Sequence, residues 1–246
     1  AARIDRERRR ASELQEVNNE LRRSNEELEQ FAYVVSHDLQ EPLRQVISFS
    51  GLIKQKLRDK VDPSTEELLN FIVDGGMRMN DLISDLLVYS RVGRGDSPKV
   101  LIAIEEAVNL AILNLKTSID EAEATIVCDQ LPSLPVNVTQ ITQVFQNLIG
   151  NAIKFRSEKK PEIYIRAEQR DSFWLFSVRD NGIGFNNEDV RIIFNIFQRL
   201  HSTDKYKGSG IGLAICRRII ELHGGHVCAE SSPGHGATFY FTLPVR

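Results

Sequence analysis

The first part of the chain carries an uninterrupted helical pattern that one helix cannot bury by itself. Apolar side chains alternate at spacings of three and four residues from Leu14 to Val35, interrupted by Ser24, with polar residues between them and no Gly or Pro before Pro42. A heptad pattern of this kind buries its apolar face only against a second helix. We therefore predict an N-terminal coiled coil over residues 1–30. A helix packed on its own domain is the alternative.

The apolar pattern continues past Pro42 to Leu57, and a second one from Leu68 to Leu87 follows the polar stretch 58–64. A short connection makes the two helices antiparallel neighbours. One hairpin has too small a core, whereas two hairpins form a four-helix bundle that buries both apolar faces. The pattern predicts a homodimer, and Pro42 predicts a bend in the first helix just after His37.

A turn-rich segment at 93–98 marks a predicted domain boundary. Beyond it, helical patterns alternate with short runs of β-forming residues, which predicts an α/β sandwich. The helical patterns cover 104–116, 140–155 and 210–223, and the β-rich runs cover 162–167, 173–178, 227–229 and 238–243. The predicted class is α+β, with domains at 1–30, 31–95 and 96–246.

Composition restricts the partners and the compartment. With 246 residues and a net charge of -3, the chain has no basic surplus for binding nucleic acid. The three cysteines, Cys128, Cys216 and Cys228, are far apart, which predicts packing roles in a reducing cytoplasm. No apolar run approaches the roughly 20 residues of a membrane helix. Because the chain opens without Met inside a helical pattern, we expect a piece of a longer protein whose sensor part lies elsewhere.

The first chemical motif is a histidine with a carboxylate beside it, His37 and Asp38, in the segment SHDLQEPL. A single histidine on a helix is usually an ordinary surface or core residue. A neighbouring carboxylate changes its chemistry, because it can keep one ring nitrogen protonated and leave the other as a nucleophile.

The second motif is a polar helix face that carries amides and one ammonium group, Asn147, Asn151 and Lys154. Carboxamide oxygens bind hard cations, and an ammonium group pairs with phosphate oxygens. A magnesium nucleotide would use both. A solvated polar stripe is the alternative reading of the same face.

Two glycine motifs follow. In Asp180-Asn-Gly-Ile-Gly-Phe185 the glycines permit a close approach to a flat ligand, and Asp180 can accept a hydrogen bond from an amino group such as that of adenine. In Lys207-Gly-Ser-Gly-Ile-Gly-Leu213, the glycines at a helix start expose backbone N–H groups to phosphate. The polar stretch 201–206 before it predicts a lid. A third glycine segment, 233–239, is expected to be a simple hairpin turn.

In their order and spacing, these segments resemble sensor histidine kinases of two-component systems from about Leu28 to Val245. SHDLQEPL is similar to the phosphoacceptor box, FQNLIGNAIKF to the asparagine box, DNGIGF to the first glycine box, IFNIFQRLH to the phenylalanine box, GSGIGLAI to the second glycine box and GHGATFYFTLP to the carboxyl-terminal glycine turn. The segment FAYVVSHDLQEPLRQV, together with FQRLH and GSGIGLAIC, is similar to the phytochrome-like branch of the family.

The resemblance implies a dimerisation and histidine-phosphotransfer bundle followed by an ATP-binding sandwich of the type shared with gyrase, heat-shock chaperone and mismatch-repair ATPases. It implies ATP-dependent phosphorylation of His37 with Asp38 as acid–base partner, charge stabilisation by Arg199, and transfer to an aspartate of a response-regulator receiver domain. Asn151 is implied as the Mg²⁺ ligand. The nucleotide site is implied to comprise Asn147, Asn151, Lys154, Asp180, Gly182, Gly184, Lys207, Gly208, Ser209, Gly210, Ile211, Gly212, Leu213 and Thr238.

Two positions depart from the family pattern. Ser209 stands where threonine is usual, a mild change that keeps the hydroxyl. Glu41 stands where members with phosphatase activity often carry Thr or Asn, so weak or absent phosphatase activity is expected. Two other functions stay open at this point: a nucleotide-binding scaffold with a silent kinase, and an ATPase that forms no phosphohistidine.

Overall fold

The computed structural model describes residues 2–57, 62–93, 98–200, 206 and 208–245. Lys207, the expected lid at 201–205 and most of the expected linker at 94–97 lie outside the described residues. So do the side chains of the coiled-coil positions Leu14, Leu21, Ser24, Leu28 and Phe31, so the packing of that seam stays a prediction. The chain divides into two compact units, Ala1–Arg91 and Val92–Arg246.

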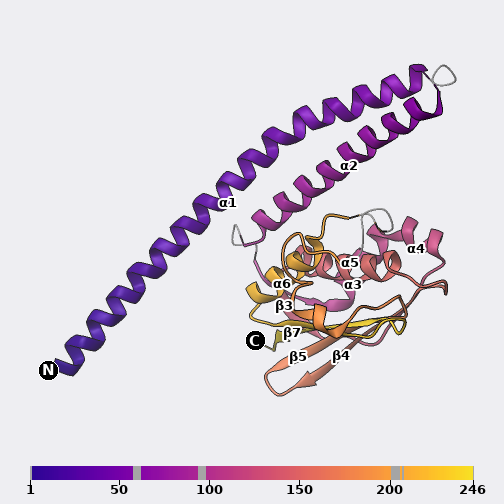
Figure 1. Ribbon diagram of the computed structural model, residues 1–246. Coiled ribbons are helices and arrows are strands. Elements are labelled where there is room, and N and C mark those ends of the chain that lie inside the picture. The colour runs from indigo at the N-terminus through magenta and orange to yellow at the C-terminus, as the bar shows by residue number, and fades with distance from the viewer. Residues whose placement is uncertain (1, 58–61, 94–97, 201–205, 207, 246) are drawn as a thin grey trace. The chain divides into compact units, whose positions relative to one another are not determined.

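The first unit is a hairpin of two long helices, α1 (Ala2–Leu57) and α2 (Pro63–Arg91) (Figure 1). Asp62 caps the start of α2. Its carboxylate accepts from the backbone N–H of Thr65 at 3.0 Å and from the Thr65 hydroxyl at 2.8 Å. Pro63 is the first helical residue, a position that needs no N–H donor. α1 stays helical through Pro42 and curves along its length in Figure 1.

Contacts across the hairpin repeat at intervals of seven residues along α1 and of seven or eight along α2. The Arg91 guanidinium lies 5.1 Å from the Tyr33 ring centroid. One heptad further along α1, the Gln40 amide donates to the Ser84 hydroxyl at 3.3 Å. One heptad further again, the backbone of Gly76 approaches Ile47 so closely that an added Cβ would lie 2.6 Å from its Cγ1. This order confirms the antiparallel arrangement predicted from the apolar pattern.

The second unit is a two-layer sandwich of helices on a five-stranded sheet (Figure 1). The sheet has the order β2 (Thr125–Cys128), β4 (Glu162–Arg170), β5 (Phe173–Asp180), β7 (Ala237–Pro244), β6 (Val227–Ser231), and only the β2–β4 pair is parallel. A two-stranded sheet of β1 (Val100–Ala103) and β3 (Ser133–Val136) accompanies it. The helices are α3 (Ile104–Asn114), α4 (Lys116–Ala122), α5 (Val138–Lys154) and α6 (Gly212–Leu222), with a short 3₁₀ turn, η1, at Asn187–Arg191.

An aromatic cluster fills the space between the helices and the sheet. Phe176 and Phe241 stack at 4.8 Å between centroids, and Phe145 of α5 meets Phe241 edge-on at 5.7 Å. All three side chains are fully buried. Burial of this large aromatic surface anchors the apolar face of α5 on the sheet. The polar face of α5 is thereby held on the side away from the core.

The structure differs from the sequence-based predictions in several places. The helix expected over 104–116 ends at Asn114, and α4 begins at Lys116 after a break at Leu115. Strands β1, β2 and β3 were not predicted. The packing role expected of all three cysteines is wrong for two of them, since Cys216 is buried but Cys128 and Cys228 are exposed. Both lie on outer strands of the sheet, β2 and β6, where less protein covers them.

Candidate functional site

His37 lies on the solvent-exposed side of α1, with its Nδ1 atom 3.2 Å from Oδ1 of Asp38. The preceding Ser36 is buried against the hairpin, so the ring points away from the helix pair. Since a carboxylate only accepts hydrogen bonds, this contact makes Nδ1 the protonated nitrogen of the neutral ring. Nε2 then carries the free lone pair, and the arrangement suits a nucleophile.

In the second unit, Asn137 caps the start of α5, and its side chain accepts from the backbone N–H of Gln140 at 3.1 Å. This cap and the buried apolar face orient the opposite, half-exposed face with Asn147, Asn151 and Lys154. Asn147 donates to the carbonyl oxygen of Gly212 at 3.1 Å. Within the described residues, the Asn151 carboxamide makes no hydrogen bond, so its oxygen is available to a ligand.

Lys154 ends α5 beside aromatic and glycine residues. Its ammonium lies 4.5 Å from the Phe155 ring centroid, and the same ring lies 5.0 Å from that of Tyr206. Burial, followed by the nearby Arg199 charge, lowers the pKa of Lys154. A partly buried cation of this kind is stabilised by an anion, which is the property required of a phosphate-binding lysine.

Asp180 ends β5 and is held by backbone donors from two segments. Its Oδ1 accepts from the N–H of Gly182 at 2.8 Å and from that of Ala237 at 3.1 Å. Burial raises the pKa of this carboxyl, and the two backbone hydrogen bonds oppose that effect. No described residue donates to Oδ2. The carboxylate therefore has one oxygen fixed by the protein and one left for a donor on a ligand.

Glycines beside Asp180 bring the backbones of two loops into contact. Gly184 has φ +63°, and a Cβ there would lie 2.2 Å from the carbonyl oxygen of Ser232. A Cβ on Gly236, at φ +78°, would lie 2.1 Å from the carbonyl oxygen of Asp180, and one on Gly182 would lie 2.5 Å from that of Phe155. Gly184 and Gly236 are required both by their left-handed backbone and by the lack of space, and Gly182 by the lack of space alone.

The second glycine motif packs against Arg199 and α5. Arg199 donates to the carbonyl oxygens of Tyr206 and Gly208, each at 2.7 Å, so its guanidinium here binds backbone. The Ser209 hydroxyl accepts from the N–H of Ile211 at 3.2 Å. Ile211 is fully buried and Leu213 half-buried. Gly210, at φ +76°, has no room for a Cβ beside Arg199 and Gln198.

The structure brings the asparagine, lysine and glycine residues together but leaves Thr238 outside the group. Thr238 alternates along β7 with the buried Ala237 and Phe239, and it contacts Tyr240 on the opposite face of the sheet. The residue that reaches Asp180 is Ala237, through its backbone N–H. Sequence reasoning missed Ala237 because a backbone donor leaves no side-chain signal.

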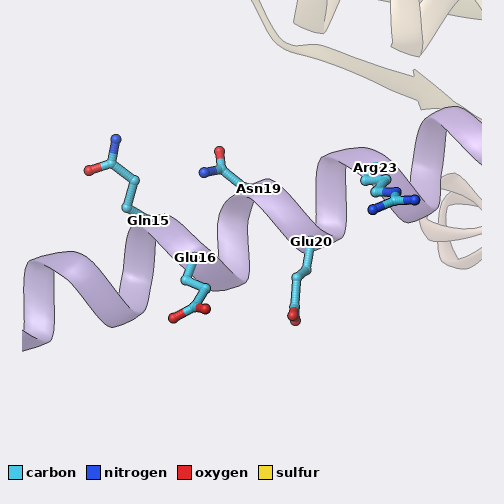
Figure 2. Close-up of a pocket in the computed structure, with 5 residues that line it drawn as sticks. All are labelled: Gln15, Glu16, Asn19, Glu20 and Arg23. Carbon is cyan, nitrogen blue, oxygen red and sulfur yellow. The ribbon is translucent and has the colours of Figure 1, made fainter.

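A hollow beside α1 is lined by Gln15, Glu16, Asn19, Glu20 and Arg23, all from one helix. In Figure 2 the side chains of Gln15 and Asn19 point to one side of the helix and those of Glu16 and Glu20 to the other. The hollow has no apolar wall and no second element to enclose a ligand. Among the described residues, no group of three or more His, Cys, Asp or Glu side chains could hold a metal ion. None of the helices in that part of the chain is long and apolar enough to cross a membrane.

Two family models match the chain. The model for the His Kinase A (phospho-acceptor) domain matches residues 27–95. The model for the histidine kinase-, DNA gyrase B- and HSP90-like ATPase matches residues 136–246.

Full-length relatives and solved structures agree with these matches. Cyanobacterial phytochrome A of Nostoc sp. is 50% identical over 237 residues, and the phytochrome-like protein Cph1 of Synechocystis sp. is 43% identical over 237 residues. Both alignments cover 96% of this chain but only 31% and 32% of those proteins, so the chain spans about a third of their length.

Among solved structures, full-length ShkA in complex with AMPPNP has a TM-score of 0.65 at 26% identity, covering 87% of this chain and 45% of ShkA. The histidine kinase ThkA in complex with the response regulator TrrA has a TM-score of 0.63 at 22% identity, covering 93% of this chain and 66% of ThkA. The second likeness supports the fold.

Proposed function

Because the chain belongs to the histidine kinases, carrying their phospho-acceptor and ATPase domains in succession, we propose that it binds Mg-ATP in the second unit and transfers the γ-phosphoryl group to His37. The observation that carries the proposal is the pairing of an exposed histidine with a carboxylate in one unit and a glycine-lined group around Asp180 and Lys154 in the other. The two groups lie in separate units, so the reaction requires them to meet.

The site residues of the second unit have separate proposed roles. The free Oδ2 of Asp180 accepts from the amino group of adenine, while its Oδ1 stays bonded to Gly182 and Ala237. Lys154 pairs with phosphate oxygens, which relieves the cost of its burial. The backbone at Gly208 and Gly210, just before α6, and at Gly212, its first residue, contributes N–H groups toward phosphate.

Magnesium fits the donors present. Mg²⁺ is usually held by one or two protein oxygens together with waters and nucleotide phosphates. The Asn151 carboxamide, with no hydrogen-bond partner among the described side chains, supplies such an oxygen next to Asn147 and Lys154 on α5. When bound, the cation neutralises negative charge on the triphosphate.

The chemistry at His37 follows from its ring contact. Nε2 attacks the γ-phosphorus, a P–N bond forms, and the bond from phosphorus to the bridging oxygen of ADP breaks. Asp38 accepts the hydrogen bond from Nδ1–H throughout, and so stabilises the positive charge that develops on the ring. Arg199 is proposed to move from the carbonyls of Tyr206 and Gly208 to the transferring group when nucleotide is bound.

The phosphorylated histidine is proposed to pass its phosphoryl group to an aspartate of a response-regulator receiver domain. The chain resembles ThkA in fold, and ThkA was solved with its response regulator. Glu41 is exposed and lies one turn after His37, with its Oε1 atom 3.9 Å from Nη2 of Arg44. A carboxylate here repels the hydroxide-like water that a phosphatase must direct at phosphoaspartate, so we expect no acceleration of regulator dephosphorylation.

A homodimer is proposed from the unequal faces of the helical hairpin. The face between α1 and α2 is lined by small residues such as Ser36, Gly76 and Ser90, which are buried. Many large apolar residues instead lie outside it and are 46–63% exposed: Val46, Phe49, Leu52, Ile53, Leu68, Phe71, Ile72, Met77 and Met79. An exposed apolar face of this extent needs a covering partner, and a second hairpin provides one.

The kinase proposal is tested by incubating the chain with γ-labelled ATP and magnesium. Acid-labile label should appear on the wild-type chain, disappear in His37→Gln, and persist in His235→Gln, a control at an exposed histidine of the second unit. Bound ATP without any label would mean a scaffold. Free phosphate released without labelled protein would mean an ATPase, and either outcome would overturn the proposal.

A further inference from the structure

Ser231, the last residue of β6, joins the two loops that surround Asp180. Its hydroxyl accepts from the backbone N–H of Phe185 at 2.9 Å and donates to the carbonyl oxygen of Gly236 at 2.8 Å. Phe185 belongs to the loop after β5, and Gly236 belongs to the turn before β7. One half-buried side chain therefore bridges both segments.

The bond to Gly236 matters because of the peptide group it holds. The carbonyl of Gly236 and the N–H of Ala237 belong to the same planar peptide unit. Ser231 holds the oxygen end of that unit, and the nitrogen end donates to Oδ1 of Asp180 at 3.1 Å. A rotation of this peptide that broke one hydrogen bond would misdirect the other.

The four groups thus form one chain of hydrogen bonds, from Phe185 N–H through the Ser231 hydroxyl and the Gly236–Ala237 peptide to the Asp180 carboxylate. Bonds in such a chain polarise one another, so each strengthens the next. The two loops are also joined directly, since the Gly234 N–H donates to the Ile183 carbonyl oxygen at 2.7 Å. This bond limits how far they can move apart.

We propose that Ser231 is a positioning residue for base recognition, which orients Asp180 so that its free oxygen meets the 6-amino group of the purine. The inference rests on the proposed binding of ATP and adds to it a residue that sets purine specificity. Ser231 touches neither substrate nor phosphate; it acts through the Gly236–Ala237 peptide.

The test compares binding of ATP with binding of inosine triphosphate, which carries an oxygen in place of the 6-amino group. Ser231→Ala should weaken ATP binding by about three- to tenfold, the effect of one lost hydrogen bond, and change inosine triphosphate binding much less. The preference for ATP should therefore fall. Ser232→Ala is the matched control, because this neighbouring hydroxyl has no hydrogen bond among the described residues and only its backbone carbonyl is used.

Two further measurements separate positioning from a general loss of structure. Ser231→Thr keeps the hydroxyl and should retain the preference for ATP. In a ¹⁵N-labelled sample, the amide proton resonance of Ala237 should shift upfield in Ser231→Ala and stay in place in Ser232→Ala, because its hydrogen bond to Asp180 weakens.

The outcomes distinguish this inference from the proposed function. If the wild-type chain binds no ATP, the proposed function fails. If it prefers ATP and Ser231→Ala, folded by circular dichroism, keeps the same preference and the same Ala237 resonance, the role of Ser231 is refuted while ATP binding stands. If Ser231→Ala does not fold, Ser231→Thr supplies the test. Loss of the preference for ATP in this variant, which keeps the hydroxyl, would also refute the role of Ser231.

Discussion

The side-chain amide of Asn147 donates to the carbonyl oxygen of Gly212 across 3.1 Å, which joins the middle of α5 to the first residue of α6. At the other end of the same helix pair, the backbone N–H of Asn137 donates to Nε2 of His223 at 3.2 Å. The shorter helix, α6, is thus bonded at both of its ends to α5, near the start and the middle of that longer helix. Asn147 belongs to the proposed nucleotide site, whereas His223 lies at the far end of α6.

Replacing Asn147 by aspartate should destabilise the second unit. The donor that faces the Gly212 carbonyl becomes a second acceptor, and leaving such a group unsatisfied costs about 1–3 kcal/mol. Denaturant unfolding followed by fluorescence of Trp174, the single tryptophan, reports this unit. Gln143→Glu makes the same change of charge on the same helix and should cost much less; an equal loss in both variants would contradict the assigned role of the bond.

Gly184→Ala should cost about 3 kcal/mol or more, because it combines a left-handed backbone with a clash. The added Cβ would lie 2.2 Å from the backbone oxygen of Ser232, which cannot rotate away. Gly234→Ala is a control with φ +80° and no atom within 4 Å of the Cβ, so it should lose only about 1 kcal/mol. The difference in unfolding free energy between the two variants measures the clash alone.

Thr142→Val should stabilise the second unit. The Thr142 hydroxyl is buried in α5 and is the one such side-chain atom in the described part of the chain that lacks a hydrogen-bond partner. A methyl group in its place removes that penalty, worth about 1 kcal/mol, and should raise the melting temperature by about 2–4 °C. Thr139→Val, on the exposed side of the same helix, should leave the melting temperature nearly unchanged. A fall in Tm for Thr142→Val would show that the hydroxyl is bonded after all.

The pH dependence of stability should report His223. Its Nδ1 donates to the Ile219 carbonyl oxygen at 2.8 Å, and its Nε2 accepts from the Asn137 N–H, so the contact to Asn137 requires the neutral ring. Burial, with a smaller effect of the nearby Lys99 charge, lowers the pKa of His223 below the usual 6.5. The unfolded chain therefore binds the proton first, and this contribution to stability is present above pH 6.5 and is lost as the pH falls below it.

The measurement is the change in Tm between pH 7.5 and pH 5.5. His223→Gln, which stays neutral, should be less stable than wild type at pH 7.5 and show a shallower decline on acidification. His235→Gln, at an exposed histidine, should decline as wild type does. An identical slope for wild type and His223→Gln would rule out titration of this ring as a cause.

The apolar spacing of α1, α2, α5 and α6 was readable from sequence because a helix buries residues at a fixed period. The longer runs of β-forming residues that became β4, β5 and β7 could likewise be predicted from the sequence. The short strands β1, β2 and β3 have four residues each, a length too short for alternation to identify a strand, so their partners define them. β2, for example, forms by parallel pairing with β4, more than thirty residues later.

By itself, the sequence determined the hairpin, the order of the two units and the residue types needed for nucleotide and phosphoryl chemistry, since these depend on local period and on side-chain identity. Only the tertiary structure decided that Ala237 rather than Thr238 reaches Asp180, that Ser231 holds the intervening peptide, and that His223 ties α6 to Asn137. The Asp180–Ala237 and Asn137–His223 contacts join residues 57 and 86 positions apart, and Ser231, which is 5 positions from Gly236, also binds Phe185, 46 positions away. A backbone N–H or carbonyl is the same in every residue except proline, so its partner is set by strand register and loop packing and leaves no mark in the local sequence.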